Sequence, residues 1–259
     1  LIGKSYNITF IPDVNFDLNL FYDAVLNQIK NTFFNEPTLN RFRFCYNFYI
    51  NPLNATPGDF DNPNERTMPI NSMVLDKISD CNIILHNINI EGRREYQLGK
   101  YFGAKYDQYG TLLHEFGHML NMTDEYRNGK LVTNYDNPND YNFKNVWENK
   151  EVVKKYCDDR SINISKIKTF IVGDNNPQTY YKICSNDCNM NNAGTVVRNY
   201  DIACQNRIIF IFSNRSGFMN YGKNVIFLKL NQSKQIKYLN DFIETEIRNE
   251  NRSFYDYRW

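Results

Sequence analysis

The residues best suited to chemistry lie in one short segment, Thr111 to Tyr126, which reads TLLHEFGHMLNMTDEY. This segment holds two of the three histidines in a chain of 259 residues, His114 and His118. On a helix, residues four apart lie on the same face, so both imidazoles can reach one cation. Two imidazoles at this spacing with a glutamate between them are typical of a zinc site. The segment therefore predicts Zn²⁺ bound by His114 and His118, with Glu115 as the general base that activates water.

A catalytic zinc also needs a third protein ligand and an open position. We expect Asp124, six residues after His118, to supply that ligand. Between them lies Asn121, where the helix must end and the chain reverse; asparagine tolerates the left-handed backbone that this requires. Glu125 is the alternative ligand, although we expect it to support the site through a hydrogen bond or an ion pair. The third histidine, His86, lies in an apolar segment and is expected to be a core or edge residue, with a ligand role as the alternative.

The elements that must position these residues follow from periodicity. A helix is predicted from Asp107 onward, because apolar residues recur there at helical spacing: Leu112, Leu113, Phe116, Met119 and Leu120. Upstream, a strand at Tyr6–Pro12, a helix at Phe16–Phe34 and an aromatic strand at Phe42–Ile50 predict a crossover that joins two parallel strands. A third strand is expected at Cys81–Ile90.

The second half of the chain is less regular. We expect a helix at Val146–Tyr156, short strands at Lys168–Gly173 and Arg207–Phe212, and a last amphipathic helix at Ser233–Ile247. The loop at Tyr135–Asn142 gathers oxygen donors of the kind that Ca²⁺ takes: Asp136, Asn137, Asn139 and Asp140. It lacks the glycine and the terminal glutamate of an EF-hand, so a structural Ca²⁺ stands beside the simpler interpretation of a polar turn.

Composition limits the classes of binding partner and the cellular locations that we expect for this chain. The net charge is +1 and the charges are interspersed, so neither nucleic acid nor an anionic membrane is indicated as a partner. No apolar run reaches the length of a membrane span, and the size of the chain demands no partner, so we expect a monomer. Glycans on the sequons at Asn121 and Asn214 would crowd the site, which favours a prokaryotic protein, secreted or at the cell surface.

The six cysteines leave three alternatives open. Disulfides in an exported protein are the first, a structural zinc held by the later four cysteines is the second, and ordinary reduced thiols are the third. The spacing of the later four does not match the paired Cys-x-x-Cys of zinc ribbons. The cysteines are Cys45, Cys81, Cys157, Cys184, Cys188 and Cys204.

The segment HEFGHMLNMTD, from His114 to Asp124, resembles the HExxHxxGxxH/D signature of the metzincin clan of zinc peptidases, with Asn121 in place of the usual glycine and Asp124 in place of the commoner histidine. That clan also carries a downstream turn with a methionine beneath the metal. The segment SGFMNYG resembles this turn, with Met219 as its methionine and Tyr221 as a tyrosine that can reach the metal site.

Within the clan, the chain is most similar to the IgA peptidase-like family of bacterial metallopeptidases. The likeness rests on HEFGH followed shortly by DEY at 124–126, and on the first strand, the helix that ends in FFNEP at Phe33–Pro37, and the aromatic strand. It covers about residues 5–130 and the methionine turn.

The resemblance implies one catalytic domain over residues 1–259, in two subdomains with a cleft between them. Residues 1–122 would form an upper subdomain with a twisted, mostly parallel sheet and helices, and residues 123–259 an irregular lower subdomain that ends in a helix. It further implies a zinc-dependent endopeptidase acting on a protein or peptide substrate, bound in extended form along an edge strand, for which we expect Cys81–Ile90. Tyr221 would then donate to the developing oxyanion.

Two functions of other classes remain open. The chain could keep the zinc as a binding or adhesion module without turnover, in which case replacing Glu115 would leave its function intact. It could instead be a zinc amidase acting on a non-protein substrate, such as a cell-wall peptide or a small molecule. A cleft too short for an extended peptide would favour the amidase.

Overall fold

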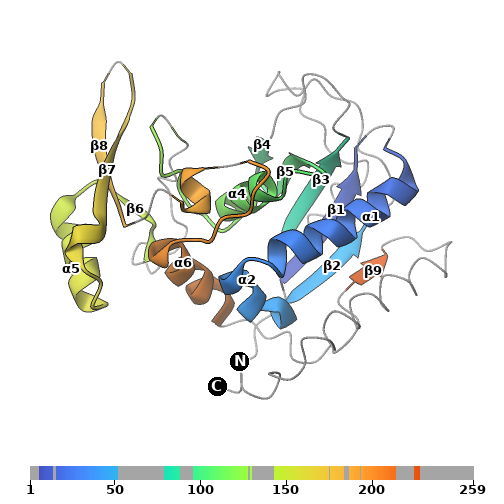
Figure 1. The fold of residues 1–259 in the computed structure, drawn as a ribbon, viewed down its shortest axis with the longest axis horizontal. Coiled ribbons are helices and arrows are strands. Elements are labelled where there is room, and N and C mark those ends of the chain that lie inside the picture. The colour runs from blue at the N-terminus through green and yellow to red at the C-terminus, as the bar shows by residue number, and fades with distance from the viewer. Residues whose placement is uncertain are drawn as a thin grey trace.

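The structure is a computed structural model of the chain, and it describes residues 6–13, 16–51, 79–87, 96–127, 129, 143–174, 176–183, 187–192, 194–213 and 225–227. Its largest element is a six-stranded sheet with the order β4-β5-β3-β1-β2-β9. The strands are β1 (Tyr6–Pro12), β2 (Tyr46–Ile50), β3 (Cys81–His86), β4 (Tyr96–Leu98), β5 (Tyr101–Lys105) and β9 (Val225–Phe227). Figure 1 shows this sheet with α1 lying across it.

The sheet is parallel except at one edge. Strand β1 pairs in parallel with β2 and β3, β2 with β9, and β3 with β5, whereas β4 pairs antiparallel with β5. The predicted crossover is confirmed, because α1 connects the parallel strands β1 and β2. Strand β3 was predicted as an edge strand, and that is wrong: it lies between β1 and β5 and is buried along its whole length.

The first helix continues from α1 (Leu18–Gln28) into one π-helical turn, η1 (Ile29–Phe33). It starts where Asp17 accepts a hydrogen bond from Leu20 N at 2.9 Å, a standard N-cap. A short helix, α2 (Pro37–Arg41), and a 3₁₀ turn, η2 (Arg43–Cys45), then lead into β2. The helix predicted at 16–34 is therefore present, while the strand predicted at 42–50 begins later, at Tyr46.

The central helix α4 (Tyr109–Met119) packs between η1 and strand β5. Its main core contact is Phe116, whose ring meets Phe33 edge-on at 4.9 Å between centroids and Tyr6 at 5.9 Å. The buried stripe that predicted this helix therefore faces the sheet. The opposite side of α4 is left to meet the second half of the chain.

The second half contributes a smaller antiparallel sheet of order β6-β8-β7, packed with α5 (Lys150–Asp159) around Trp147. The strands are β6 (Val146–Trp147), β7 (Ile167–Val172) and β8 (Gln178–Ile183), with a 3₁₀ turn η4 (Ile164–Lys166). In Figure 1 this unit stands to the left, apart from the large sheet. The strand predicted at 168–173 is confirmed, whereas the helix predicted at 146–156 begins only after Asn149 caps it.

The strand predicted at Arg207–Phe212 is wrong, because this apolar run lies in helix α6 (Ile202–Ser213). Its buried residues Cys204, Ile208 and Phe212 recur every fourth position, and Phe212 packs on Tyr6, Phe42 and Tyr46 of the first half. A continuous apolar run does not by itself distinguish a buried strand from a buried helix. Helix α6 thus joins the main core, preceded by the 3₁₀ turn η5 (Asn189–Asn191).

The described residues form a mixed α/β fold with a largely parallel sheet. The helix predicted at 233–247 and the loop at Tyr135–Asn142, with its proposed calcium ligands, lie outside them. No helix in the part of the chain covered here has the length and apolar character to cross a bilayer. The five cysteines within the described ranges are free thiols, so the expected disulfides are not formed there; Cys184 lies outside.

Phe116 links α4 to the sheet, so its truncation should destabilise the whole domain. We expect Phe116→Ala to lower the free energy of unfolding by about 3–5 kcal/mol, since it removes a fully buried ring and leaves a cavity. Urea denaturation followed by circular dichroism measures this. The control is Leu20→Ala, at a position 40 % exposed on α1, which should change stability by about 0.5 kcal/mol or less. Equal losses for both variants would contradict the packing.

Candidate metal centre

The site begins where α4 ends. Asn121 adopts a left-handed conformation with φ of 57°, as predicted. Its N–H donates to the carbonyl of His118 at 2.9 Å, and the N–H of Met122 donates to the carbonyl of Gly117 at 3.0 Å. This pair of bonds is the Schellman motif, which closes a helix and turns the chain back on itself. The residues that follow are therefore directed toward the face of α4 that carries the histidines.

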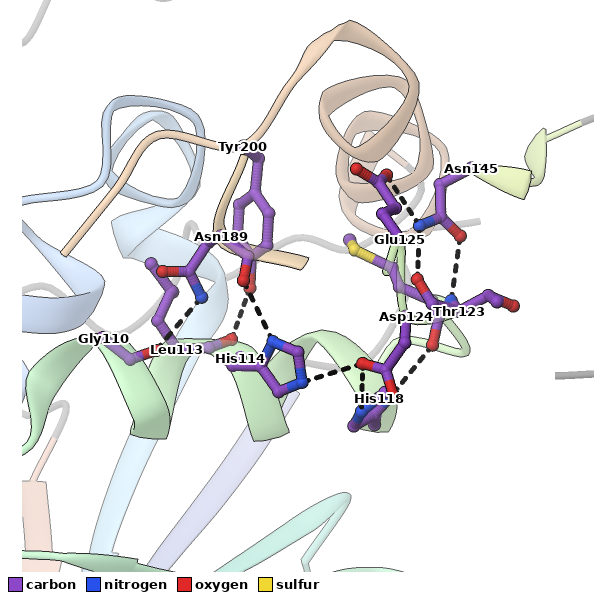
Figure 2. A network of polar contacts seen from close by, with 11 residues as sticks. Gly110, Leu113, His114, His118, Thr123, Asp124, Glu125, Asn145, Asn189 and Tyr200 are labelled. Carbon is purple, nitrogen blue, oxygen red and sulfur yellow. Dashed lines mark hydrogen bonds and ion pairs between the residues drawn. The ribbon is translucent and has the colours of Figure 1, made fainter. Parts of the chain in front are cut away.

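This reversal brings Asp124 to both imidazoles. Asp124 Oδ1 lies 2.9 Å from His114 Nε2 and 3.2 Å from His118 Nε2. All three side chains are buried, and the two rings are nearly perpendicular, at 88°. Figure 2 shows Asp124 turned toward the histidines while the carboxyl group of Glu125, the next residue, points away. Asp124 thus occupies the third-ligand position that the sequence predicts, and Glu125 does not.

Each imidazole is held by its other nitrogen. His114 Nδ1 lies 2.9 Å from the carbonyl oxygen of Asn189, and His118 Nδ1 lies 2.9 Å from that of Met122. Because a carbonyl only accepts hydrogen bonds, both Nδ1 atoms must carry the proton. In the neutral rings this leaves the lone pairs on the two Nε2 atoms that meet at Asp124, the arrangement found for histidines that bind a metal.

The electrostatics follow from burial and from this contact. Burial alone lowers the pKa of His114, but hydrogen bonding to Asp124 and its charge outweigh burial, so the pKa is raised. For Asp124 burial opposes ionisation, yet the two histidines hold its pKa well below the usual range. The carboxyl group is therefore ionised at neutral pH, as a metal ligand must be.

These three donors fit one small divalent cation. Their ligand atoms lie within 4.8 Å of one another. Around a tetrahedral ion with ligand distances of about 2.0–2.1 Å, neighbouring donors lie about 3.3 Å apart. The contacts of 2.9 and 3.2 Å need only a small expansion to reach that spacing. His114, His118 and Asp124 would thus hold the metal, with the remaining position left for water or substrate.

Asn145 fastens the segment that carries Asp124. Its side chain accepts from Thr123 N at 2.9 Å and donates to Thr123 O at 2.7 Å and to Glu125 Oε1 at 3.0 Å. Both backbone groups of the residue before Asp124 are thereby satisfied by one buried amide. Sequence reasoning missed Asn145 because it is 20 residues downstream of Glu125 and belongs to no local motif.

The second half of the chain fastens the other side of α4. The backbone carbonyl of Asn189 accepts the hydrogen bond from His114 Nδ1, and the side-chain amide of Asn189 donates to Gly110 O at 3.1 Å. A side chain at Gly110 would overlap the backbone of Gly194 and Val196, so only glycine lets these two residues lie this close to α4. Asn189 was not predicted either, since the contact spans 75 residues.

Glu115 and Tyr126 border the three ligands. Glu115 is half-buried on α4, next to His114. The ring of Tyr126 stacks on that of His114 with 6.1 Å between centroids, and 38 % of the residue is exposed. Burial raises the pKa of Tyr126, and the charge of Asp124, a hydrogen bond to Asp124 and the charge of Glu115 raise it further. Tyr126 was not predicted as a site residue, although it directly follows the Asp-Glu pair.

The remaining predicted residues fall elsewhere. His86 is fully buried in β3 and pairs with Asp13 through Nδ1 at 3.0 Å, so it is a core residue, away from the three ligands. Met219 and Tyr221 lie outside the residues that the structure describes. Comparisons with protein-family models, with curated protein sequences and with solved structures find no match to this chain.

Removing the side-chain amide of Asn145, which holds the backbone of Thr123 and is called the Asn145 clamp, should loosen the segment that carries Asp124. We expect Asn145→Ala to cost about 1–3 kcal/mol of stability, because buried backbone groups of Thr123 lose their partner. It should also weaken zinc binding by about 10–100-fold, the usual effect of losing a group that orients a ligand. Isothermal titration calorimetry with Zn²⁺ measures the affinity. Asn176→Ala, at an exposed position beside β8, is the control and should match the native chain. Unchanged zinc affinity in Asn145→Ala would exclude the clamp.

The Asp124–His114 contact should also make the stability of the metal-free chain depend on pH. Asp124 has a lowered pKa, so its contribution is present above the unfolded value of about 4 and is lost only in strong acid. His114 has a raised pKa, so its contribution is present below the unfolded value of about 6.5 and is lost as the pH rises through the folded value.

We therefore expect the urea midpoint of the chelator-treated chain to be highest between about pH 4 and 6.5 and to fall toward pH 8. The Asp124→Asn variant should lose most of this alkaline decline, because the amide carries no charge to attract the imidazolium. A midpoint that rises steadily from pH 6 to pH 8 in the native chain would refute the assignment.

Proposed function

We propose that this chain is a zinc-dependent endopeptidase of the metzincin clan, closest to the IgA peptidase-like family. One observation carries the proposal: Asp124 Oδ1 meets Nε2 of both His114 and His118, while both Nδ1 atoms are held by backbone carbonyls. Two imidazoles and one carboxylate with an open position form a ligand set typical of catalytic zinc. Asn121 stands where the clan has a glycine, and its left-handed conformation is the one for which glycine is usually required.

Zinc is the metal that this donor set and the His-Glu-x-x-His spacing together favour, since two imidazoles and a carboxylate by themselves also hold iron(II). Imidazole nitrogen suits Zn²⁺, whereas Ca²⁺ and Mg²⁺ prefer six or more oxygen ligands. A bound zinc ion would polarise the scissile carbonyl and lower the pKa of the attacking water. The proposed hydrolysis needs no other chemistry from the zinc ion.

The side chains around the ligands would handle the protons. Glu115, next to His114 on the half-exposed side of α4, would accept the proton of the attacking water and pass it to the leaving amine. Tyr126 keeps its phenol protonated, because burial and the neighbouring carboxylates raise its pKa. It is therefore a candidate donor to the developing oxyanion, beside the Tyr221 that the sequence suggests.

An extended peptide would bind along β4. Among the described strands β4 is the outer one at that end of the sheet, and it also contacts α4. Its outer side pairs with no other described strand, and a peptide would add there as a further strand, the usual way in which a sheet edge binds an extended peptide. This role passes to β4 from Cys81–Ile90, because β3 is in the interior of the sheet.

The fold would then divide as the clan does. Residues 1–122 would supply α4 and every strand of the large sheet except β9, and residues 123–259 the small antiparallel sheet, α5, α6 and the strand β9 at the edge of the large sheet. The reversal at Asn121 lies at this boundary and delivers Asp124 from the second part to the histidines of the first. The substrate would occupy the space between the two parts, beside β4.

Replacing the proposed base should separate metal binding from turnover. We expect Glu115→Gln to bind one zinc ion at the histidine site with native affinity, because Glu115 is not a ligand. It should cleave an unfolded protein at least about 100-fold more slowly, the lower limit of what a general base contributes. Zinc is measured by mass spectrometry and cleavage by release of new amino termini. Glu151→Gln, at an exposed position on α5, is the control.

Three results would count against this function. Equal cleavage by the native chain and Glu115→Gln would exclude Glu115 as the base. Zinc bound at the histidine site without cleavage of any peptide would favour a binding module. Hydrolysis confined to small amides would favour the amidase.

A further inference from the structure

A second group of metal-binding side chains lies beside the first and shares none of its ligands. It comprises Glu125, Cys188, Asp201 and Cys204, whose donor atoms lie within 4.8 Å of one another. Glu125 follows the reversal after α4, Cys188 precedes η5, and Asp201 and Cys204 begin α6. Three segments that are distant in the sequence thus bring two thiols and two carboxyl groups to one point in the interior.

Each carboxyl group has one oxygen engaged and one that is not. Glu125 Oε1 accepts from Asn145 at 3.0 Å and from the thiol of Cys204 at 3.3 Å. Asp201 Oδ1 caps α6 by accepting from the N–H groups of Ala203 and Cys204, each at 3.0 Å. The other oxygens, Glu125 Oε2 and Asp201 Oδ2, are buried, and no N–H, O–H or S–H group of the described residues donates to them. Such atoms are costly to bury unless a proton or a cation satisfies them. In the metal-free chain, burial, the charge of Glu125 and a hydrogen bond between the two carboxyl groups raise the pKa of Asp201 well above its usual value, so a shared proton takes the place that a cation would fill.

The two sulfur atoms are spaced for a shared metal. Cys188 Sγ and Cys204 Sγ lie 3.8 Å apart. A disulfide would bring them to about 2.05 Å. Two thiolates bound tetrahedrally to zinc at about 2.3 Å each are separated by about 3.8 Å. The spacing of the sulfur atoms is therefore that of neighbouring ligands of one ion.

We propose that Glu125, Cys188, Asp201 and Cys204 form a second metal site, for a thiophilic divalent cation such as Zn²⁺. Four protein ligands complete the tetrahedron and leave no open position, so the site is structural. It differs in composition from the four-cysteine zinc considered from the sequence, since the carboxylates of Glu125 and Asp201 take the places of Cys157 and Cys184. A cation satisfies both remaining carboxylate oxygens, which a disulfide between the two cysteines would leave without a counter-charge.

The charges around the group are compatible with this assignment. Burial raises the pKa of Cys188 to about 12 and that of Cys204 well above its usual value, so both thiols are protonated in the metal-free chain. The cation must displace these protons, as in other thiolate sites. Lys182 donates to the backbone carbonyl of Glu125 and to Asn191, and its charge offsets part of the excess negative charge.

The second site would brace the first. Glu125 directly follows Asp124, and Cys188 directly precedes Asn189, whose carbonyl orients His114. The N–H of Glu125 also donates to the carbonyl of Met190 at 3.0 Å, joining the two segments. A metal that ties Glu125 to Cys188 therefore fixes one ligand of the first site and the group that orients another.

Cobalt substitution tests the second site separately from the first. Co²⁺ takes the place of zinc, and a thiolate ligand gives it a sulfur-to-cobalt charge-transfer band, which the histidine site cannot produce because it has no sulfur. We expect the metal-free native chain to bind two Co²⁺ ions and to show this band. His118→Ala should bind one ion and keep the band, whereas Cys188→Ser/Cys204→Ser should bind one ion and lose it.

A native chain without the band would overturn the proposal, and so would a band that survives Cys188→Ser/Cys204→Ser. A mass two hydrogens lower under non-reducing conditions, with both cysteines in one cross-linked peptide, would show a disulfide and would also overturn it. A band with only one bound ion would support the second site and count against the first, so the two proposals fail separately.

Two further variants guard against misfolding. Cys157→Ser replaces a buried cysteine outside the group and should keep both ions and the band. Asp201→Ser removes one ligand but keeps a residue that can cap α6, so the helix is retained while the band should shift and cobalt binding should weaken. An unchanged band and affinity in Asp201→Ser would exclude Asp201 as a ligand.

Discussion

The contact of Asp124 with both histidines is the interaction on which the arrangement of this protein depends. A helix can present two imidazoles on one face, but it cannot supply a third ligand to the same point without turning back. The left-handed Asn121 provides that turn, and the two backbone bonds around it close α4. The helix itself is immobilised from both sides, by Phe116 against the sheet and by Asn189 from the second half.

Much of the candidate site could be predicted from the sequence because its signals are local. The spacing of His114 and His118, the turn at Asn121 and the reach of Asp124 all lie within one segment of eleven residues, and backbone geometry relates them directly. The groups that hold this segment in place could not be predicted. Asn145 and Asn189 contact it from 22 and 75 residues away, and an isolated asparagine carries no sign of what it will bond.

The fold divides in the same way. The crossover from β1 through α1 to β2 could be predicted because the spacing of apolar residues is that of a strand, then of a helix, then of a strand. This spacing is a local property of the sequence. The order of strands could not: β3 is interior because β5 pairs with it, and neither β5 nor β4 was predicted. The turn at Gly99, with φ of 57°, between two tyrosine-containing runs was the available signal for that hairpin. The apolar run in α6 could have been a buried strand or a buried helix, because a continuous run of apolar residues has no periodicity that distinguishes the two.

Anomalous diffraction at the zinc edge, from crystals of the zinc-loaded chain, tests the central claim most directly. The account predicts a strong peak about 2.0–2.2 Å from His114 Nε2, His118 Nε2 and a carboxylate oxygen of Asp124, with both Nδ1 atoms still on their backbone carbonyls. The absence of a peak there, with Asp124 still in direct contact with the two imidazoles, would contradict it. In that case the three residues would form a buried ion pair, and the proposed peptidase would lose its metal.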